Sequence, residues 1–357
     1  MLDLFAGAGG MTLGFSRLGF ESVLAVEIDP AAAASHAANF GKHVHAAPIQ
    51  EVLKFPKVEL IIGGPPCQGF SPLGRDRDDR SRARLNSLWR EYLRAVKQVR
   101  PPVFVVENVP EFLKSAQFQT FLRVCRRDEL LSDYEIEARV LNAADYGVPQ
   151  RRRRGIIIAS RVGRPRWPEK THGSGNGDSF TEELSLKPYA TVREAIGDLP
   201  LEPDGEFGKS LHFGRNPTAK SLDRYRAVPE GGNRFDLARN RPDLLPDCWR
   251  RKKTGTTDVF GRLWWDRPAF TIRTEFFKPE KGRFLHPEAD RPITHREAAR
   301  LQTFPDDFKF VGSKTEVARQ IGNAVPPLLA EALAEAVRAL LLKRPWSRQI
   351  SSSRSSA

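Results

Sequence analysis

The 357-residue chain has 57 lysines and arginines against 44 aspartates and glutamates, a formal net charge of +13 that favours a polyanionic partner such as nucleic acid. Its hydrophobic content of 40% is typical of a globular protein of about two domains, and no apolar run approaches the roughly 20 residues of a membrane helix. The three cysteines form no C-x-x-C pair, which argues against a zinc site and a disulfide framework and is typical of a cytoplasmic protein.

Short apolar runs alternate with helical patterns over residues 1–165, which predicts a parallel β-sheet with helices on both faces. Four of these runs lead into a polar motif: MLDLF into a glycine-rich turn, SVLAVEID into two acids, LIIGG into Cys67, and PVFVVENV into Glu107 and Asn108. An arginine run instead precedes the fifth, RGIIIAS. Because ligands bind beyond the carboxyl ends of the strands in such sheets, we expect the site at these motifs.

Residues 3–15, DLFAGAGGMTLGF, combine a strand with Gly7, Gly9 and Gly10 at the start of a helix. Such a turn lets a ligand approach the backbone, and Glu27 at the end of the next strand can accept hydrogen bonds from a ribose. The pattern is not G-x-G-x-x-G, which disfavours a dinucleotide site. The turn and the acid together favour an adenosine-containing cofactor over a simple tight turn beside a solvated acid.

The segment IIGGPPCQGFS, residues 61–71, places Cys67 after two glycines and two prolines. The glycines let the backbone turn and the prolines stiffen it, which fixes the thiol in one place; the alternative is a turn with a small buried residue. Glu107 ends an apolar strand, where burial favours a protonated carboxyl group that can donate to a substrate. The alternatives for Glu107 are a helix cap or a surface acid.

Two more motifs are turns with polar residues. In QRRRR, residues 150–154, alternate residues entering a strand point to one side, so that Arg152 and Arg154 can reach one ligand; the alternative is a solvated basic turn. The segment IGNAVPP, residues 321–327, leads into the helical pattern PPLLAEALAEAVRALLL, and its alternative is simply a turn.

The composition changes near residue 165. Residues 166–291 are rich in proline, glycine, arginine and aromatic residues and have weak periodicity, which predicts a smaller second domain of strands and loops. Helical patterns return from about residue 292, where Thr294 is a candidate helix cap. We expect residues 343–357 to be disordered.

Six of these segments, in this order, resemble the sequence blocks of the bacterial DNA (cytosine-5) methyltransferases: DLFAGAGG, GGPPCQGFS, ENV, QRRRR, REAARLQTFP and IGNAVPP. The resemblance covers about residues 1–165 and 290–342. It implies an α/β fold in which residues 1–165 plus 292–342 form a Rossmann-like, S-adenosylmethionine-dependent methyltransferase domain. Residues 166–291 would be a smaller, irregular target-recognition domain, with DNA in the cleft between the two domains.

The resemblance also implies the roles of the site residues. Cys67 matches the family's nucleophile, which adds to carbon 6 of a flipped-out cytosine so that carbon 5 can take a methyl group. Glu107 matches the residue at ring nitrogen 3, and Arg154 matches the residue at the cytosine carbonyl, with Arg152 in a supporting role. Asn108 would orient the Pro-Pro-Cys loop.

The implied cofactor is S-adenosylmethionine, with S-adenosylhomocysteine as its product and with no metal. The family often has an aspartate for the adenine amino group where this chain has Pro48, so we expect backbone groups or Ile49 to hold the adenine. Besides Ile49, the matched cofactor positions are Phe5, Ala6, Gly7, Gly9, Gly10, Glu27, Ile28, Pro66, Leu88, Asn323 and Val325.

Double-stranded DNA is the implied partner of what we expect to be a monomer, and a cognate restriction endonuclease is a second candidate partner. We expect residues 69–86 to form a mobile lid that closes over the flipped base; the alternative is an ordinary charged loop. The residues that we expect to contact DNA are Gln68, Ser71, Arg75, Lys252, Lys253 and Arg273.

Three other functions are alternatives to DNA cytosine-5 methylation. The nearest is a transfer-RNA cytosine-5 methyltransferase on the same scaffold, although the basic and aromatic middle region favours a duplex reader. The set of Cys67, Glu107 and Arg154 argues against a catalytically silent DNA-binding protein. The missing G-x-G-x-x-G pattern disfavours a nucleotide-dependent oxidoreductase.

Overall fold

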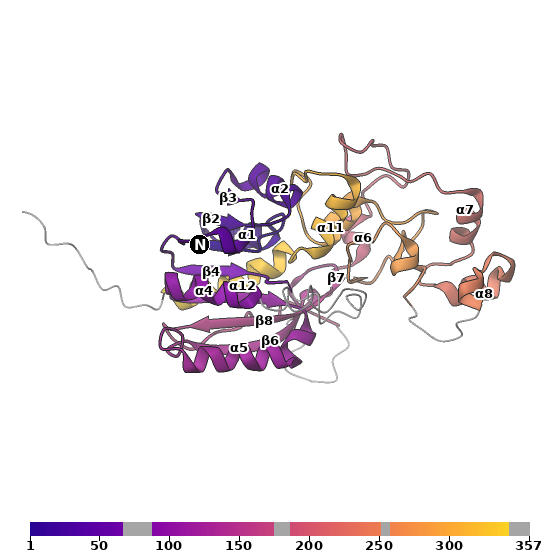
Figure 1. Cartoon of the computed structure of the whole chain (residues 1–357). Coiled ribbons are helices and arrows are strands. Elements are labelled where there is room, and N and C mark those ends of the chain that lie inside the picture. The colour runs from indigo at the N-terminus through magenta and orange to yellow at the C-terminus, as the bar shows by residue number, and fades with distance from the viewer. Residues whose placement is uncertain (67–87, 175–185, 251–257, 343–357) are drawn as a thin grey trace, which may run out of the picture.

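The computed structural model describes residues 1–66, 88–174, 186–250 and 258–342. A large sheet flanked by helices makes up one part of the molecule, and residues from the middle of the chain extend away from it toward α7 (Ala219–Arg226) and α8 (Arg234–Asn240) (Figure 1). None of the helices in these ranges is both long and apolar enough to cross a membrane.

The large sheet has seven strands in the order β3-β2-β1-β4-β5-β8-β6. Neighbouring strands pair in parallel except around β8, which runs antiparallel to both β5 and β6. The reversed direction of β8 brings its first residues to the edge where β5 ends, and this places the arginine run at the carboxyl edge of the other strands. The strands are β1 (Leu2–Leu4), β2 (Leu24–Val26), β3 (Val44–His45), β4 (Leu60–Gly63), β5 (Val103–Asn108), β6 (Glu135–Asn142) and β8 (Arg153–Ser160).

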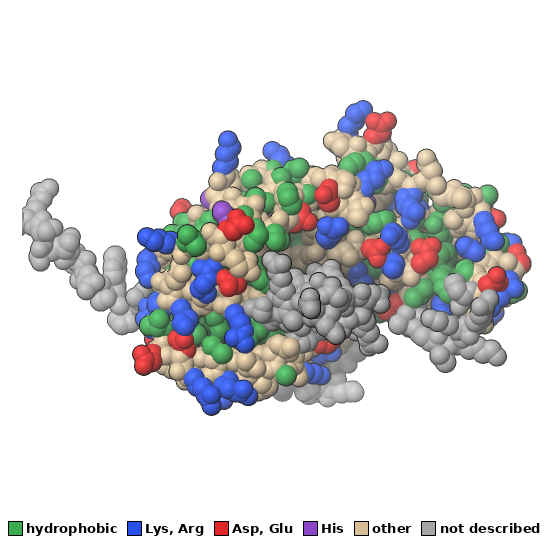
Figure 2. Space-filling model, viewed as in Figure 1, with side chains coloured by type: hydrophobic (Ala, Val, Ile, Leu, Met, Phe, Trp, Pro, Cys, Tyr) green, Lys and Arg blue, Asp and Glu red, His purple; other side chains and the backbone are tan. Residues whose placement is uncertain are grey.

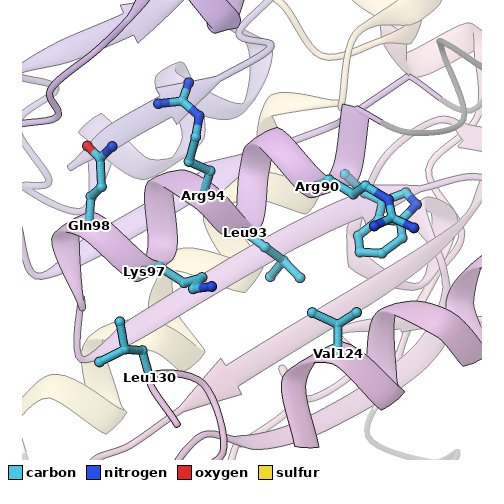
Figure 3. Close-up of a pocket in the computed structure, with 8 residues that line it drawn as sticks. Arg90, Leu93, Arg94, Lys97, Gln98, Val124 and Leu130 are labelled. Atoms are coloured by element: carbon cyan, nitrogen blue, oxygen red, sulfur yellow. The ribbon is translucent and has the colours of Figure 1, made fainter. Parts of the chain in front are cut away.

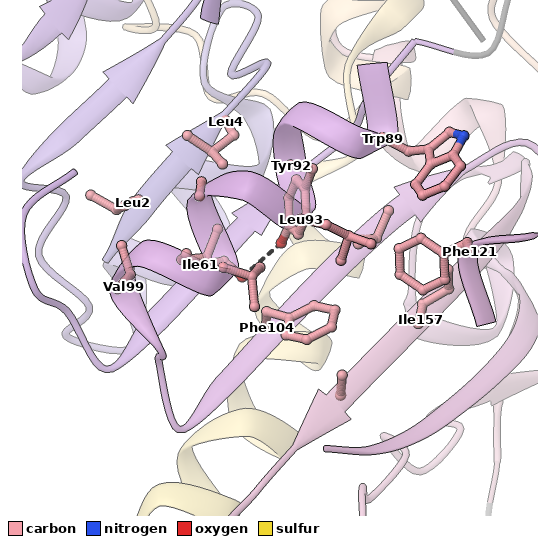
Figure 4. Packing of buried hydrophobic residues seen from close by; sticks show 14 of the residues in the cluster. Leu2, Leu4, Ile61, Trp89, Tyr92, Leu93, Val99, Phe104, Phe121 and Ile157 are labelled. Atoms are coloured by element: carbon pink, nitrogen blue, oxygen red, sulfur yellow. Dashed lines mark hydrogen bonds between the residues drawn. The ribbon is translucent and has the colours of Figure 1, made fainter. Parts of the chain in front are cut away.

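Helices cover both faces of this sheet, as alternation of the strand side chains requires. On one face α4 and α5 bury the cluster drawn in Figure 4, where the Tyr92 hydroxyl donates to the Ile61 carbonyl at 3.1 Å. On the other face α1 and α12 pack on the remaining strand side chains and on each other. Gly14 allows that contact, because a Cβ there would lie 2.5 Å from the Pro327 carbonyl oxygen. These helices are α1 (Gly10–Arg17), α2 (Pro30–Phe40), α4 (Leu88–Val99), α5 (Ala116–Arg127) and α12 (Pro327–Leu342).

The remaining elements are short and belong mostly to the middle of the chain. Three two-stranded pairs, β9 with β10, β11 with β13 and β12 with β7, lie outside the large sheet. Short 3-10 turns, such as η1 (Ile49–Glu51) and η4 (Ala143–Tyr146), join several of the longer elements. The short strands are β7 (Gln150–Arg151), β9 (His172–Gly173), β10 (Lys187–Pro188), β11 (Gly261–Arg262), β12 (Ala269–Phe270) and β13 (Arg283–Leu285). The helices are α6 (Val192–Ile196), α7 (Ala219–Arg226), α8 (Arg234–Asn240), α9 (Asp247–Arg250), α10 (His295–Leu301) and α11 (Lys314–Asn323).

Buried arginines hold much of this irregular middle part together. Arg262 donates to the backbone carbonyls of Tyr225, Val228, His286 and Ala289 at 2.7–2.8 Å. A guanidinium group with several donors satisfies buried carbonyls that no sheet or helix pairs. The prediction of strands and loops here was therefore incomplete, because it missed the short helices α6–α9 and the buried arginine centres.

The middle part and the helices α10 and α11 share one hydrophobic cluster. Trp265, Ile272 and Phe276 pack in it with Leu301 and Ile321, and all five side chains are buried. The chain around residue 292 therefore continues one packed unit rather than crossing a solvated linker. Trp264 and Phe270 are instead half-buried and stack on each other at a ring distance of 6.1 Å.

Candidate active site

The glycine-rich turn after β1 carries backbone strain where the sequence predicts a ligand. Phe5, Gly7 and Gly9 all have positive φ angles, 62°, 56° and 98°. Such angles are uncommon for a residue with a side chain, and strain of this kind gathers at functional sites. Open space surrounds the position that a Cβ of Gly7 would take, so the turn has room for a ligand against its backbone.

Glu27 ties this turn to the end of β2. One carboxylate oxygen accepts from the Gly7 amide and the other from the Asp29 amide, both at 2.7 Å. Burial raises the pKa of Glu27 above its ordinary value, against the effect of these two hydrogen bonds. The neighbouring Ile28 side chain is 65% exposed, which leaves an apolar surface beside a hydrogen-bond acceptor.

The turn between α11 and α12 packs directly on the glycine-rich turn. A Cβ at Gly10 would lie 2.4 Å from the Val325 carbonyl oxygen, so only glycine permits this approach. Asn323, the last residue of α11 where this turn begins, is exposed, and Val325 in the turn is buried. The structure therefore brings Asn323 and Val325, more than 300 residues later in the chain, next to the predicted cofactor turn.

Three other predicted cofactor positions have different surroundings. The Ile49 side chain is only 3% exposed and packs in the core, and its carbonyl accepts from Arg94 at 2.8 Å. The Ile49 side chain therefore has little free surface with which to hold an adenine, because it packs in the core with the side chains of β1. The other two positions, Pro66 and Leu88, are half-buried and leave surface for a ligand, as does Pro48.

Glu107 and Arg154 form an ion pair at the ends of two adjacent strands. The Arg154 Nε lies 2.8 Å from a Glu107 carboxylate oxygen, and both side chains are largely buried, with 14% and 12% of their surface exposed. The pair exists because β8 runs antiparallel to β5, which lays Glu107 opposite Ile156 and close to the first residues of β8.

The loop that leads to Cys67 lies against this ion pair. A Cβ at Gly64 would stand 3.0 Å from a Glu107 carboxylate oxygen. The Asn108 side chain donates to the Pro65 carbonyl at 3.1 Å and accepts from the Val109 amide at 2.8 Å, as expected for a residue that orients the loop. Cys67 itself lies outside the described residues.

Arg152 lies beside this pair but is engaged elsewhere. Its side chain is among the largest that are fully buried, with 1% exposed, and both of its terminal nitrogens donate to backbone carbonyls. The two neighbours, Arg151 and Arg153, are exposed. Of the arginines in the run, Arg154 is thus the one that meets Glu107.

Gln150 is a buried polar residue of the same run that the sequence analysis did not single out. Its carboxamide oxygen accepts from the Ile272 amide at 2.8 Å, and its nitrogen donates to the Gln302 side chain at 2.9 Å. Gln302 in turn donates to the Ile321 carbonyl at 2.6 Å. The signal available in the sequence was a glutamine just before a buried strand, where a polar side chain needs partners.

The predicted DNA-contacting residues are mostly beyond what the structure describes. Gln68, Ser71 and Arg75, the predicted lid at residues 69–86, and Lys252 and Lys253 all lie outside the described residues. The remaining one, Arg273, is exposed, and its side chain donates to the Lys281 carbonyl at 3.4 Å. On the face shown in Figure 2, lysine and arginine side chains lie over both parts of the molecule.

A cavity of about 430 Å³ lies away from this edge, between α4 and α5 (Figure 3). Its lining combines apolar side chains such as Leu93 and Val124 with basic ones such as Arg90. It contains none of the predicted catalytic residues. Within the described ranges, no group of three histidine, cysteine, aspartate or glutamate side chains is arranged to hold a metal ion.

Comparison with known proteins places this geometry in a family. The family model for C-5 cytosine-specific DNA methylase matches residues 1–339. The type II methyltransferase M1.HphI of Haemophilus parahaemolyticus is 37% identical over 346 residues, covering 94% of this chain and 86% of that protein. The type II methyltransferase M.XorII of Xanthomonas oryzae is 35% identical over 391 residues, covering 96% and 85%.

A solved structure shows the same fold. It is a prophage-encoded E. coli chain described as a DNA modification methyltransferase, with a TM-score of 0.69 and 26% identity over 96% of this chain and 99% of that one. The predicted α/β methyltransferase fold is thereby confirmed. By its family match and its relatives, this chain belongs to the C-5 cytosine-specific DNA methylase family and is an enzyme.

Proposed function

We propose that the chain transfers a methyl group from S-adenosylmethionine to carbon 5 of a cytosine within a specific duplex DNA sequence. The observation that supports it most is the ion pair of Glu107 with Arg154 at 2.8 Å, beside the loop that leads to Cys67. A carboxyl group and a guanidinium that converge beside a predicted thiol nucleophile provide the three functions that activation of a cytosine ring needs.

The chain's residues divide the chemistry as follows. The Cys67 thiolate forms a bond to carbon 6, and the electron pair of the carbon 5–carbon 6 double bond becomes available at carbon 5. Glu107 supplies a proton to ring nitrogen 3 as the negative charge develops, and Arg154 donates hydrogen bonds to the ring carbonyl. S-adenosylmethionine supplies an electrophilic methyl group, and its sulfur keeps the bonding electron pair. Loss of the carbon 5 proton to solvent water then restores the double bond and releases the thiolate of Cys67, and the proton on ring nitrogen 3 returns to Glu107.

The ion pair holds the Glu107 and Arg154 side chains next to each other before a base binds. A bound cytosine would offer its carbonyl to Arg154 and its ring nitrogen to Glu107, so that two hydrogen bonds to the base replace the ion pair.

For the cofactor, we propose that the turn of Gly7, Gly9 and Gly10 lies against the methionine part. Glu27 would accept from the ribose hydroxyls and Ile28 would contact the adenine. Both Glu27 oxygens already accept backbone amides, and each keeps a second lone pair for a hydroxyl donor. Phe5, Asn323 and Val325 complete the site at the turns that pack together.

We further propose that residues 1–165 and 292–342 carry the catalysis and that residues 166–291 recognise the target sequence in DNA. The relatives named type II methyltransferases support a cognate restriction endonuclease as a functional partner. To reach the buried carbon, the enzyme must flip the cytosine out of the duplex. The net charge of +13 favours the phosphate contacts that hold the flanking duplex.

Two kinds of basic residue are expected to behave differently in DNA binding. Replacing Lys252 or Lys253 by alanine should weaken binding to all duplexes alike and lower the salt dependence of log Kd by about one unit of slope. Replacing the exposed Arg273 by alanine should instead relax the preference at one position of the target sequence. Titrations of duplexes that differ at single positions, at several salt concentrations, separate the two effects. Unchanged affinity and preference in all three variants would move the DNA-reading surface elsewhere in residues 166–291.

The function is tested by methyl transfer to matched substrates. Purified enzyme is incubated with S-adenosylmethionine that carries a labelled methyl group, and with duplex DNA or transfer RNA, followed by nucleoside analysis. We expect the label in 5-methyldeoxycytidine from the duplex. Label in the transfer RNA alone would favour the RNA methyltransferase, and DNA binding without any label would favour the catalytically silent protein.

A further inference from the structure

The Arg152 guanidinium joins two distant segments of the chain. It donates to the Ile272 carbonyl at 3.0 Å, and to the Gly322 and Ala324 carbonyls at 2.9 and 2.8 Å. Ile272 belongs to the part proposed to recognise DNA, whereas Gly322 and Ala324 flank Asn323 in the turn proposed to hold the cofactor. One buried side chain therefore satisfies backbone acceptors from both sites.

The backbone segments near this arginine are packed so closely that they cannot slide past one another. A Cβ at Gly322 would lie 2.5 Å from the Arg273 carbonyl carbon and from the Thr274 amide nitrogen. On the other side of the same turn, a Cβ at Gly10 would lie 2.4 Å from the Val325 carbonyl oxygen. The cofactor turns and the segment at residues 272–274 thus pack backbone against backbone.

The buried Gln150 and Gln302 side chains connect the same two segments of the chain. Gln150 holds the Ile272 amide, and its partner Gln302 holds the Ile321 carbonyl one residue before Gly322. The strand that follows Arg152 begins at Arg153 and carries Arg154 to Glu107. A shift of the turn at residues 322–325 would therefore also move residues 272–274, here called the recognition segment, and the start of β8.

We propose that Arg152 is a positioning residue that couples cofactor binding to DNA binding. Its charged donors hold the cofactor turn and the recognition segment as one unit, so that a ligand that orders one of them favours the bound arrangement of the other. This inference rests on the proposed function, because it takes residues 322–325 as part of the cofactor site and residues 272–274 as part of the DNA-binding domain.

The test measures the Kd for a duplex that the enzyme methylates, without and with saturating S-adenosylhomocysteine, which cannot donate a methyl group. The wild type is expected to bind the duplex at least about fivefold more tightly with S-adenosylhomocysteine, the lower end of typical coupling. In Arg152→Met the ratio of the duplex Kd without S-adenosylhomocysteine to the duplex Kd with it should fall to about one. The Kd for S-adenosylhomocysteine alone should change by a smaller factor than this ratio does. Arg152→Lys, which keeps the charge with fewer donors, should give an intermediate ratio.

Two further variants separate coupling from stability. Gly322→Ala keeps the arginine but adds a Cβ that would push the recognition segment away from the turn. It should therefore also lower the ratio. Arg139→Met removes an exposed arginine on β6 and should keep the wild-type ratio even if its melting temperature changes. A wild-type ratio in Arg152→Met or Gly322→Ala, or a ratio of one in the wild type, would overturn the coupling. A wild type that binds neither S-adenosylhomocysteine nor any duplex would overturn the proposed function itself.

Discussion

Cys67→Ser is expected to abolish methyl transfer to DNA while binding of S-adenosylmethionine stays within a fewfold of the wild type. A serine hydroxyl is a much weaker nucleophile than a thiolate at neutral pH, and only the bond to carbon 6 requires the sulfur. The measurement is incorporation of labelled methyl groups into a duplex, alongside calorimetric titration of the cofactor. Near-wild-type incorporation would remove Cys67 from its proposed role.

Cys125 provides the matched control. Its side chain is 1% exposed, and burial raises the pKa of its thiol to about 12, so it cannot supply a thiolate near neutral pH. Cys125→Ser should therefore retain methyl transfer. A duplex with 5-fluorocytosine at the target base adds a direct readout, because fluorine cannot leave carbon 5 as a proton does. The wild type and Cys125→Ser should form a covalent complex that survives denaturation, and Cys67→Ser should form none.

The second large effect is expected from the ion pair. Glu107→Gln retains a hydrogen bond but cannot supply a proton, and Arg154→Ala removes the donor to the ring carbonyl. Each should lower the turnover rate by about 10²–10⁴-fold, the range for a lost general acid. Because the two side chains lie 2.8 Å apart, the double variant should lose less than the product of the two single effects.

Single-turnover kinetics with saturating cofactor measure these losses. Arg153→Ala is the control, since this exposed neighbour carries the same charge without reaching Glu107. A loss of cofactor affinity with unchanged turnover in Glu107→Gln or Arg154→Ala would mean that the roles of the two sites are reversed. Full additivity in the double variant would show that the pair does not act as a unit.

The alternation of apolar runs and helices predicted the sheet and the edge at which the motifs meet. What periodicity could not give was the direction of β8, because an apolar strand has the same side-chain pattern whichever way it runs. Only the pairing of β8 with β5 and β6 explains why an arginine run that precedes its strand still reaches the carboxyl edge. The hydrophobic pattern also carried no signal for α6–α9, because helices of four to eight residues are too short to show a clear 3.6-residue apolar period. Their few apolar side chains, such as Ile196 and Leu237, are nevertheless buried.

The candidate site likewise has residues whose surroundings the sequence predicted and residues whose surroundings it did not. Glu107 and Arg154 stand together, and Asn108 holds the loop before Cys67. Arg152 follows the same alternation as Arg154 in the sequence, but three backbone carbonyls from distant segments occupy it. Long-range acceptors of this kind leave no local trace in the sequence. Ile49 likewise was predicted by its position relative to the missing aspartate, although its side chain is needed in the core.

The most direct test of the account is bisulfite sequencing of DNA from bacterial cells that express this chain and have no cytosine methylation of their own. Bisulfite converts cytosine to uracil but leaves 5-methylcytosine unconverted, so each methylated position is read in its sequence context. We predict unconverted cytosines at one recurring short sequence, and none in cells that express Cys67→Ser. Complete conversion of every cytosine in cells that hold the folded wild-type enzyme would contradict sequence-specific cytosine-5 methylation of DNA.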